Sequence, residues 1–249
     1  MSRAIEVRPV PGLPEVREGD RLGKLLAEAA EPLQDDVLVV SQKVVSKSEG
    51  RTRRLDDVDV SAEARELAAR LGKDPALVQL VLDESRSVVR ARSGVLITET
   101  HSGWICANAG IDASNVAVEN AVTLLPLDAD ASARRIRSEI RAARGSSPAV
   151  VISDSFGRPW RLGQLDVAIG CAGVGPLDDW KGRRDRVGRE LAATVVAVAD
   201  EVAAAADLVK DKDAGVPAAI VRGLAELVTE DDGPGAAAIQ RPAPEDLFR

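Results

Sequence analysis

The stretch AVVISDS, residues 149–155, is an apolar run that ends in an aspartate and a serine. Its length and its β-branched residues predict a buried strand with Asp154 and Ser155 at its end. A carboxylate at a strand end can face a cleft, and a neighbouring hydroxyl can add a second oxygen ligand for a hard divalent cation. A turn-forming aspartate in an ordinary loop is the alternative interpretation.

Three further apolar stretches extend the predicted sheet. VLVVSQKVVSK (37–47) predicts a buried strand that continues through Lys43 and Lys47, with both lysines on one face. They form either a phosphate-binding pair or a solvated edge. VPAAIVRGL (216–224) predicts the last strand, and the glycine-rich DVAIGCAGVG (166–175) indicates closely packed backbones.

The remaining elements follow from helical spacing, capping residues and alternation. Helices are predicted over 21–30, 61–71, 74–84, 130–144 and 186–209, and shorter strands over 5–10, 88–92 and 94–100. Helices and strands mix without a strict βαβ rhythm, which favours an α+β fold. The composition near 60–90 indicates a helical insertion within a single unit spanning 1–249, and the Pro-rich end, 233–249, is expected to be loosely held.

The composition narrows the class of protein. The chain has 249 residues, 45% of them hydrophobic, which is typical of a globular protein. Its formal net charge is −7, with 33 basic and 40 acidic residues, which argues against a nucleic-acid binder. Two cysteines make no disulfide framework, and no apolar run approaches the ~20 residues of a membrane span. We therefore expect a cytoplasmic protein without a membrane segment.

Common catalytic and nucleotide-binding motifs are absent from the sequence. There is no G-x-x-x-x-G-K-[ST], and the glycines at 170–175 do not form G-x-G-x-x-G, so close packing explains them better. His101 is the only histidine and reads as a surface turn residue rather than a general base. Cys106 and Cys171 read as core thiols.

Two polar stretches are candidates for anion and metal chemistry. Arg158, Trp160 and Arg161 follow Asp154 closely, which favours an anion held nearby. Asp112 lies in NAGIDASN, which could be either a ligand-bearing loop or an Asx turn.

Six motifs in fixed order carry a resemblance to a known family. They are GLPEVREGD, VVSQKVVSKSEGR, GVLITETHSGWICANAGIDASN, SDSFGRPWRLGQLDVAIG, GRRDRVGREL and GVPAAIVRG. Over about residues 5–248 the chain resembles the coenzyme F420-0:L-glutamate ligase family. The resemblance implies a two-domain α+β subunit in an intertwined homodimer. It also implies a GTP-dependent ligase that joins L-glutamate to coenzyme F420-0, adds further gamma-linked glutamates and uses an acyl-phosphate intermediate. Mn²⁺ or Mg²⁺ is the implied metal, with K⁺ as a further candidate ion.

The resemblance also assigns roles to residues. The implied catalytic and metal positions are Asp112, Asp154 and Ser155, with Asp211 as a further metal ligand. The implied nucleotide-binding positions are Leu13, Pro14, Glu15, Val16, Gln42, Lys43, Lys47, Asn115, Val209, Lys210, Lys212 and Gly215. Candidates for contacts with the other substrates are Arg158, Trp160, Arg161 and Asp166.

Three positions depart from the family pattern. Ser155 is usually Thr in relatives, Asp211 is often Gln, and Gln42 is often Ser. Serine keeps the hydroxyl, and a carboxylate is a competent metal ligand. For Lys210 to Asp213, a solvated helix end is the alternative interpretation.

Two other functions remain compatible with the sequence. The chain could be the ligase half of a bifunctional protein whose flavin-binding reductase domain follows Arg249. It could also be a non-catalytic nucleotide-binding relative, although the retained Asp112, Asp154 and Ser155 argue against that.

Overall fold

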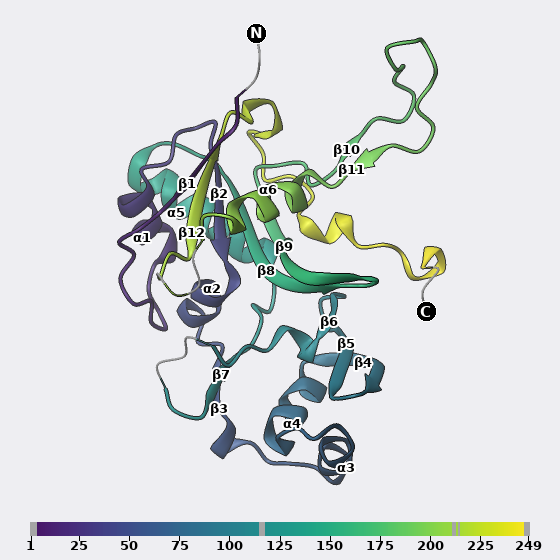
Figure 1. Ribbon diagram of the computed structural model, residues 1–249. Helices are drawn as coiled ribbons and strands as arrows, with labels where there is room; N and C mark the ends of the chain where they lie inside the picture. Colours follow the sequence, from purple (N-terminus) through teal and green to yellow (C-terminus); the bar gives the residue numbers. More distant parts are fainter. Residues whose placement is uncertain (1–3, 115–117, 211–212, 214, 247–249) are drawn as a thin grey trace.

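A computed structural model describes residues 4–114, 118–210, 213 and 215–246. Its centre is a mixed five-stranded sheet (Figure 1). In spatial order the strands are β1 (Glu6–Pro9), β12 (Ala218–Arg222), β2 (Val37–Ser41), β8 (Ala149–Arg158) and β9 (Arg161–Ala172). The neighbours β2 and β8 run parallel, and the other pairs are antiparallel. The mixed α+β composition agrees with the predicted class.

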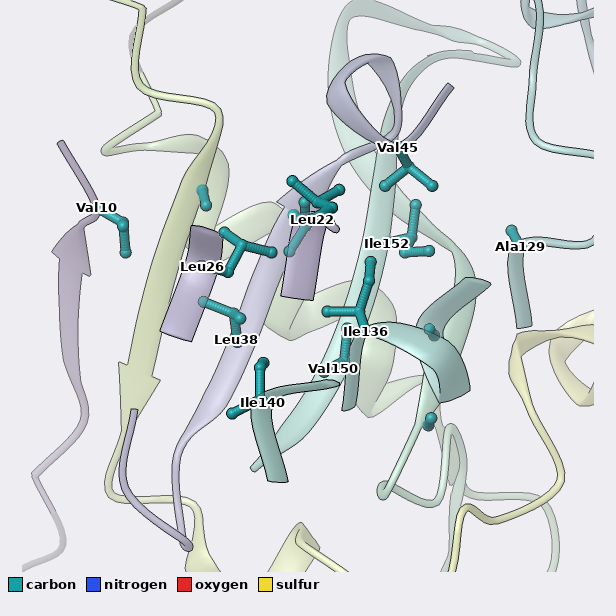
Figure 2. Close-up of a cluster of buried hydrophobic side chains, with 14 of the residues drawn as sticks. Val10, Leu22, Leu26, Leu38, Val45, Ala129, Ile136, Ile140, Val150 and Ile152 are labelled. Carbon is teal, nitrogen blue, oxygen red and sulfur yellow. The ribbon is translucent and has the colours of Figure 1, made fainter. Parts of the chain in front are cut away.

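Helices bury both faces of this sheet. α1 (Leu22–Ala30) and α5 (Ala129–Arg144) pack on one face, where Leu38 of β2 joins their side chains (Figure 2). α6 (Val198–Asp207) packs on the other face, against Val37 and Val39. Burial on both faces explains why the strand sequences are continuous apolar runs without alternation.

Residues 52–125 form a second compact part, in the lower half of Figure 1. Its strands are β3 (Thr52–Arg54), β4 (Ser85–Arg92), β5 (Val95–Thr100), β6 (Ile105–Ala107) and β7 (Ala121–Thr123). The helices α3 (Ala62–Leu71) and α4 (Pro75–Asp83) begin at the predicted caps, Ser61 and Asp74. This part has hydrophobic clusters of its own. A division into two domains stays a prediction.

Short 3₁₀ segments and the membrane question complete the description. The segments are η1 (Leu55–Asp57), η2 (Asn108–Gly110), η3 (Ala225–Leu227), η4 (Ala236–Ile239) and η5 (Ala243–Glu245). η4 lies within the Pro-rich end, yet Ala236 is fully buried and its N–H donates to Asp130 at 2.7 Å. In the part of the chain that the structure describes, no helix is long and apolar enough to cross a membrane.

The predicted strand over 37–47 is wrong beyond Ser41. The chain turns there into α2 (Gln42–Ser48), in which the Ser46 hydroxyl donates to the Gln42 side chain at 2.9 Å. A short apolar run does not distinguish a buried strand from a buried helix. Lys43 and Lys47 still share a face, because residues four apart are neighbours on a helix.

Asp154 and Ser155 do not end their strand. β8 continues to Arg158 and pairs with β9 in a hairpin, with Asp154 opposite Val167 and Ser155 opposite Asp166. The polar residues read as a loop because their side chains do not follow the alternation of a half-buried strand. Their surroundings are polar, as described below.

The long helix predicted over 186–209 is also wrong. Only Val198–Asp207 is helical, and the preceding residues form an arm with β10 (Asp178–Asp179) and β11 (Val195–Val196) that extends from the body in Figure 1. Asp185 accepts backbone hydrogen bonds from Val187 and Arg189, which stabilises a turn instead of a helix.

Gly170 is the point of closest approach between β9 and α5. A Cβ there would lie 2.4 Å from the carbonyl carbon of Ala129. Because the clash is with backbone, we expect Gly170→Ala to lower the free energy of unfolding by about 1–3 kcal/mol. Urea denaturation measures the loss. Gly72→Ala tests the alternative cost of a positive φ alone, since a Cβ there meets no atom within 4 Å. Unchanged stability of Gly170→Ala would contradict the packing interpretation.

Candidate active site

A pocket of about 710 Å³ lies where β2 turns into α2. Its walls come from five separated stretches of the chain: the loop 13–16, the turn 41–47, the segment 106–114, the β8–β9 hairpin and the segment 207–217. Segment 106–114 belongs to the second compact part, and the other stretches belong to the sheet and its connections. The pocket is therefore built from both parts.

Asp112 forms the acidic end of one wall. Lys43 of α2 forms an ion pair with it at 2.8 Å and also contacts the Ser114 hydroxyl at 2.6 Å. The Ser114 N–H donates to Asp112 at 2.6 Å. Burial raises the pKa of Asp112, but the hydrogen bonds from Lys43 and Ser114 outweigh it and hold that pKa below its usual value. Asp112 is therefore a carboxylate at neutral pH.

Asp154 has the opposite electrostatic character. Burial, together with the negative charges of Asp166 and Asp112, raises its pKa to about 7. A backbone hydrogen bond from Ser155 and the charge of Lys43 only partly oppose this. Near pH 7 the carboxyl is thus poised between its two forms, and a cation beside it would favour the charged form.

Asp166 and Lys210 form a buried ion pair behind Ser155. The Lys210 ammonium donates to Asp166 at 2.6 Å, and the Ser155 hydroxyl donates to the other oxygen of the same carboxylate at 2.7 Å. Burial raises the pKa of Asp166, but the charge and hydrogen bond of Lys210 hold it below its usual value. Lys210 is therefore not the solvated helix end that its sequence also allowed.

Lys47 extends the basic side of the pocket. It lies one turn from Lys43 on α2 and forms a 2.6 Å ion pair with Glu15, whose loop lines the same pocket. The side chains of Lys43 and Lys47 are 16% and 13% exposed, so both reach into the molecule rather than into solvent. This placement favours the phosphate-binding interpretation over the solvated edge.

The donor set suits a hard divalent cation that shares its ligands with a substrate. In residues 4–114, 118–210, 213 and 215–246, no three histidine, cysteine or acidic side chains converge on one point. The two carboxylates of Asp112 and Asp154, with the Ser155 hydroxyl, line one pocket. Mg²⁺ is commonly bound by one or two carboxylates, with phosphate oxygens and water completing its shell. The residues present fit such an ion.

Most of the predicted nucleotide positions line this pocket. Those that do are Leu13, Pro14, Glu15, Val16, Gln42, Lys43, Lys47, Lys210 and Gly215. Val209 instead packs against the hydrophobic cluster under α6. Asn115, Asp211 and Lys212 lie outside the described residues.

The substrate candidates separate into two groups. Asp166 lines the pocket. Arg158, Trp160 and Arg161 are not among its lining residues and lie at the tip of the β8–β9 hairpin, where Trp160 is 82% exposed. Arg158 donates to the Leu162 carbonyl at 2.8 Å and so closes its own hairpin.

The remaining sequence candidates have structural roles. Cys106 and Cys171 are buried free thiols, as predicted, and burial raises the pKa of each to about 12. His101 is exposed in a turn, and its Nε2 lies 3.0 Å from the Asp83 carbonyl.

Sequence reasoning missed the turn at Asn108–Gly110. All three of its residues have positive φ, and the buried Asn108 Oδ1 has no hydrogen-bond partner among the described residues. Asn108 and Gly110 both line the pocket. Backbone of this kind is concentrated at functional sites. The dipeptides around Gly110 were the available signal, because consecutive turn-forming residues mark such conformations.

Comparison with known proteins gives a consistent result. A family model described as F420-0:Gamma-glutamyl ligase matches residues 12–223. The coenzyme F420:L-glutamate ligase of Methanopyrus kandleri is 45% identical over 247 residues, which cover 98% of each chain. The enzyme of the same name from Methanothermobacter thermautotrophicus is 45% identical over 246 residues, 96% of this chain and 97% of the relative. That from Archaeoglobus fulgidus is 46% identical over 221 residues, 88% of each. The chain therefore belongs to the F420-0:gamma-glutamyl ligase family.

Proposed function

We propose that this protein is a ligase that joins L-glutamate to coenzyme F420-0 by an amide bond, with GTP and a divalent cation. The relatives named above carry this activity in their names. The observation that carries the proposal is the pocket itself, in which Asp112, Asp154 and Ser155 lie across from the α2 lysines. Opposed carboxylates and lysines are what a metal-bound polyphosphate requires.

The proposed reaction has two steps. The terminal carboxylate of F420-0 attacks the γ-phosphorus of GTP, which forms an acyl phosphate and releases GDP. The glutamate amine then attacks the acyl carbon, a C–N bond forms, phosphate leaves, and the amine loses its proton to solvent or phosphate. Both steps depend on positioning and charge neutralisation and need no protein nucleophile. The same cycle with the new terminal carboxylate would add a further gamma-linked glutamate.

Each side of the pocket has a separate task in this scheme. Lys43 and Lys47 would neutralise phosphate oxygens, and the loop 13–16 would enclose the nucleotide. Asp112, Asp154 and Ser155 would hold Mn²⁺ or Mg²⁺, which would neutralise phosphate charge when bound. Lys43 already neutralises Asp112 at 2.8 Å, so the α2 lysine and the carboxylate are mutually oriented before any ligand enters.

We expect the affinity for Mn²⁺ to rise with pH between 6 and 8. Asp154, whose pKa is raised to about 7 mainly by burial, must lose its proton to act as a ligand. Below pH 7 each unit should therefore weaken binding by up to about tenfold, and above it the dependence should level off. Calorimetry in two buffers of different ionisation enthalpy would also detect the released proton. Affinity that is flat between pH 6 and 8 would contradict the assignment.

A turnover assay tests the function. The purified chain is incubated with F420-0, L-glutamate, GTP and Mn²⁺, and mass spectrometry counts the glutamates added while GDP is measured in parallel. Formation of the amide with one GDP per bond supports the proposal. Stoichiometric binding of GTP without product would instead indicate a nucleotide-binding relative. Substituting ATP tests the nucleotide, for which we expect a lower kcat/KM.

We further propose that the protein is a cytoplasmic homodimer. The arm with β10 and β11 extends from the body, and Val187 on it is 71% exposed, so part of the arm lacks cover within one chain (Figure 1). Sedimentation equilibrium at micromolar concentration measures the mass. A stable species of 26.2 kDa would contradict the dimer.

A further inference from the structure

Asp166 is a buried carboxylate of β9 that three side chains contact. Its Oδ2 accepts from Lys210 at 2.6 Å and from Ser153 at 2.8 Å, and its Oδ1 accepts from Ser155 at 2.7 Å. Lys210 also donates to the Ser153 hydroxyl at 2.7 Å. Asp166 is 4% exposed and Lys210 is 6% exposed, so solvent screens this network little.

We propose that Asp166 is a positioning residue, which orients the Ser155 hydroxyl and anchors the segment 207–217 so that a divalent cation and nucleotide phosphates can bind together. The inference rests on the proposed function, because it takes Ser155 as a cation ligand. It replaces a role for Asp166 in contacting the other substrates, since both oxygens of its carboxylate are directed to protein donors.

The orientation of Ser155 follows from the number of its protons. A hydroxyl has one proton, and Ser155 donates it to Asp166. Every further contact of the Ser155 oxygen must therefore be as an acceptor, which is the role that a cation requires. Without Asp166 the hydroxyl could rotate and turn its proton towards the pocket. Partners of this kind fix the orientation of metal ligands and increase their basicity.

The second effect of Asp166 is on the opposite wall. Lys210 follows α6 directly and lies within the segment whose residues Asp213, Gly215 and Val216 line the pocket. In the part of the chain that the structure describes, Asp166 is the carboxylate that pairs with Lys210. Removing it would leave a buried ammonium without a counter-charge, and the segment would have to move to expose it. One carboxylate thus positions two walls.

Binding of Mn²⁺ to the purified full chain in the presence of GTP, measured by calorimetry, tests the proposal. We expect Asp166→Asn to weaken this binding by about 10–100-fold, the usual effect of losing such a partner. Asp200→Asn is the matched control. Asp200 is also buried, accepts one N–H from Ala168 of the same strand and is not among the pocket-lining residues. Its affinity for Mn²⁺ should stay within about twofold of the wild type.

A pair of double variants separates positioning from general damage. If Asp166 acts on the cation through Ser155, then Asp166→Asn and Ser155→Ala together should weaken Mn²⁺ binding no more than the stronger single change. If Asp166→Asn alone fails to fold, Asp166→Asn with Lys210→Met removes both buried charges and should restore the fold but not the affinity. Wild-type affinity in any folded Asp166→Asn variant, or full additivity with Ser155→Ala, would overturn the proposal.

The test distinguishes this inference from the proposed function. A wild-type chain that binds Mn²⁺ and GTP but makes no amide overturns the function, and the binding measurements still decide the role of Asp166. A wild-type chain that ligates normally together with an unaffected Asp166→Asn variant overturns the inference alone. A wild-type chain that binds neither Mn²⁺ nor GTP overturns both.

Discussion

Asp154→Asn should abolish ligation while leaving the protein folded and, above pH 7, more stable than the wild type. The pKa of this carboxyl is raised from 3.8 to about 7, chiefly by burial and then by the charges of Asp166 and Asp112. A carboxyl with a raised pKa favours the folded state when protonated. Its charge therefore costs stability progressively from about pH 4 to pH 7, and the cost is constant above pH 7. A neutral amide of the same shape avoids a cost of up to about 4 kcal/mol.

Activity should change in the opposite direction. An amide is a weaker cation ligand than a carboxylate, and loss of a ligand from a phosphoryl-transfer site removes several kcal/mol of stabilisation. We expect kcat/KM to fall by at least about 10³-fold at saturating Mn²⁺. Urea denaturation at pH 5 and pH 8 measures the stability difference, and the Asp200→Asn control should keep its activity. Near-normal turnover would show that Asp154 is not a ligand.

Arg137→Met should lower the free energy of unfolding by about 3–5 kcal/mol. Arg137 lies on α5 and is only 3% exposed. Its guanidinium donates to the carbonyls of Thr229 at 2.6 Å and Asp231 at 2.7 Å, and to that of Pro148 at 3.0 Å. It also forms a 2.9 Å ion pair with Asp232. Methionine fills similar space but leaves these acceptors without donors.

Urea denaturation measures this loss, with two comparisons. Arg137→Lys keeps the charge but not the planar set of donors, so it should fall between wild type and Arg137→Met. Arg141→Met changes an exposed arginine one turn later on the same helix and should alter stability by less than about 0.5 kcal/mol. A loss below about 1 kcal/mol for Arg137→Met would show that water replaces the guanidinium at the carbonyls.

The core of the fold could be predicted because its signals are local. The apolar runs at 149–152 and 218–221 became central strands, since residues buried on both faces must all be apolar. Ser61 and Asp74 marked helix starts because each side chain accepts hydrogen bonds from the first turn. These signals lie within a few residues of the element that they predict.

The errors arose where distant residues decide the local conformation. The β8–β9 hairpin brings Asp166 next to Ser155, and Lys210, 44 residues further along, closes the same network. No spacing within a short window reveals that pairing. A polar extension of a strand therefore resembled a loop, and a buried lysine resembled a solvated helix end. The resemblance to a known family supplied the pocket residues that local patterns could not.

The position of the pocket between the two compact parts gives its ligands a mechanical role. Asp112 belongs to the part made by residues 52–125, whereas Asp154 and Lys47 belong to the sheet and its connections. A metal-bound nucleotide that contacts all three would act as a reversible cross-link between the parts. Binding at 100 times Kd would then add about 2.7 kcal/mol to the stability of the whole, and both parts would unfold together at a higher temperature. Without the ligand, the Lys43–Asp112 ion pair is one such link already in place.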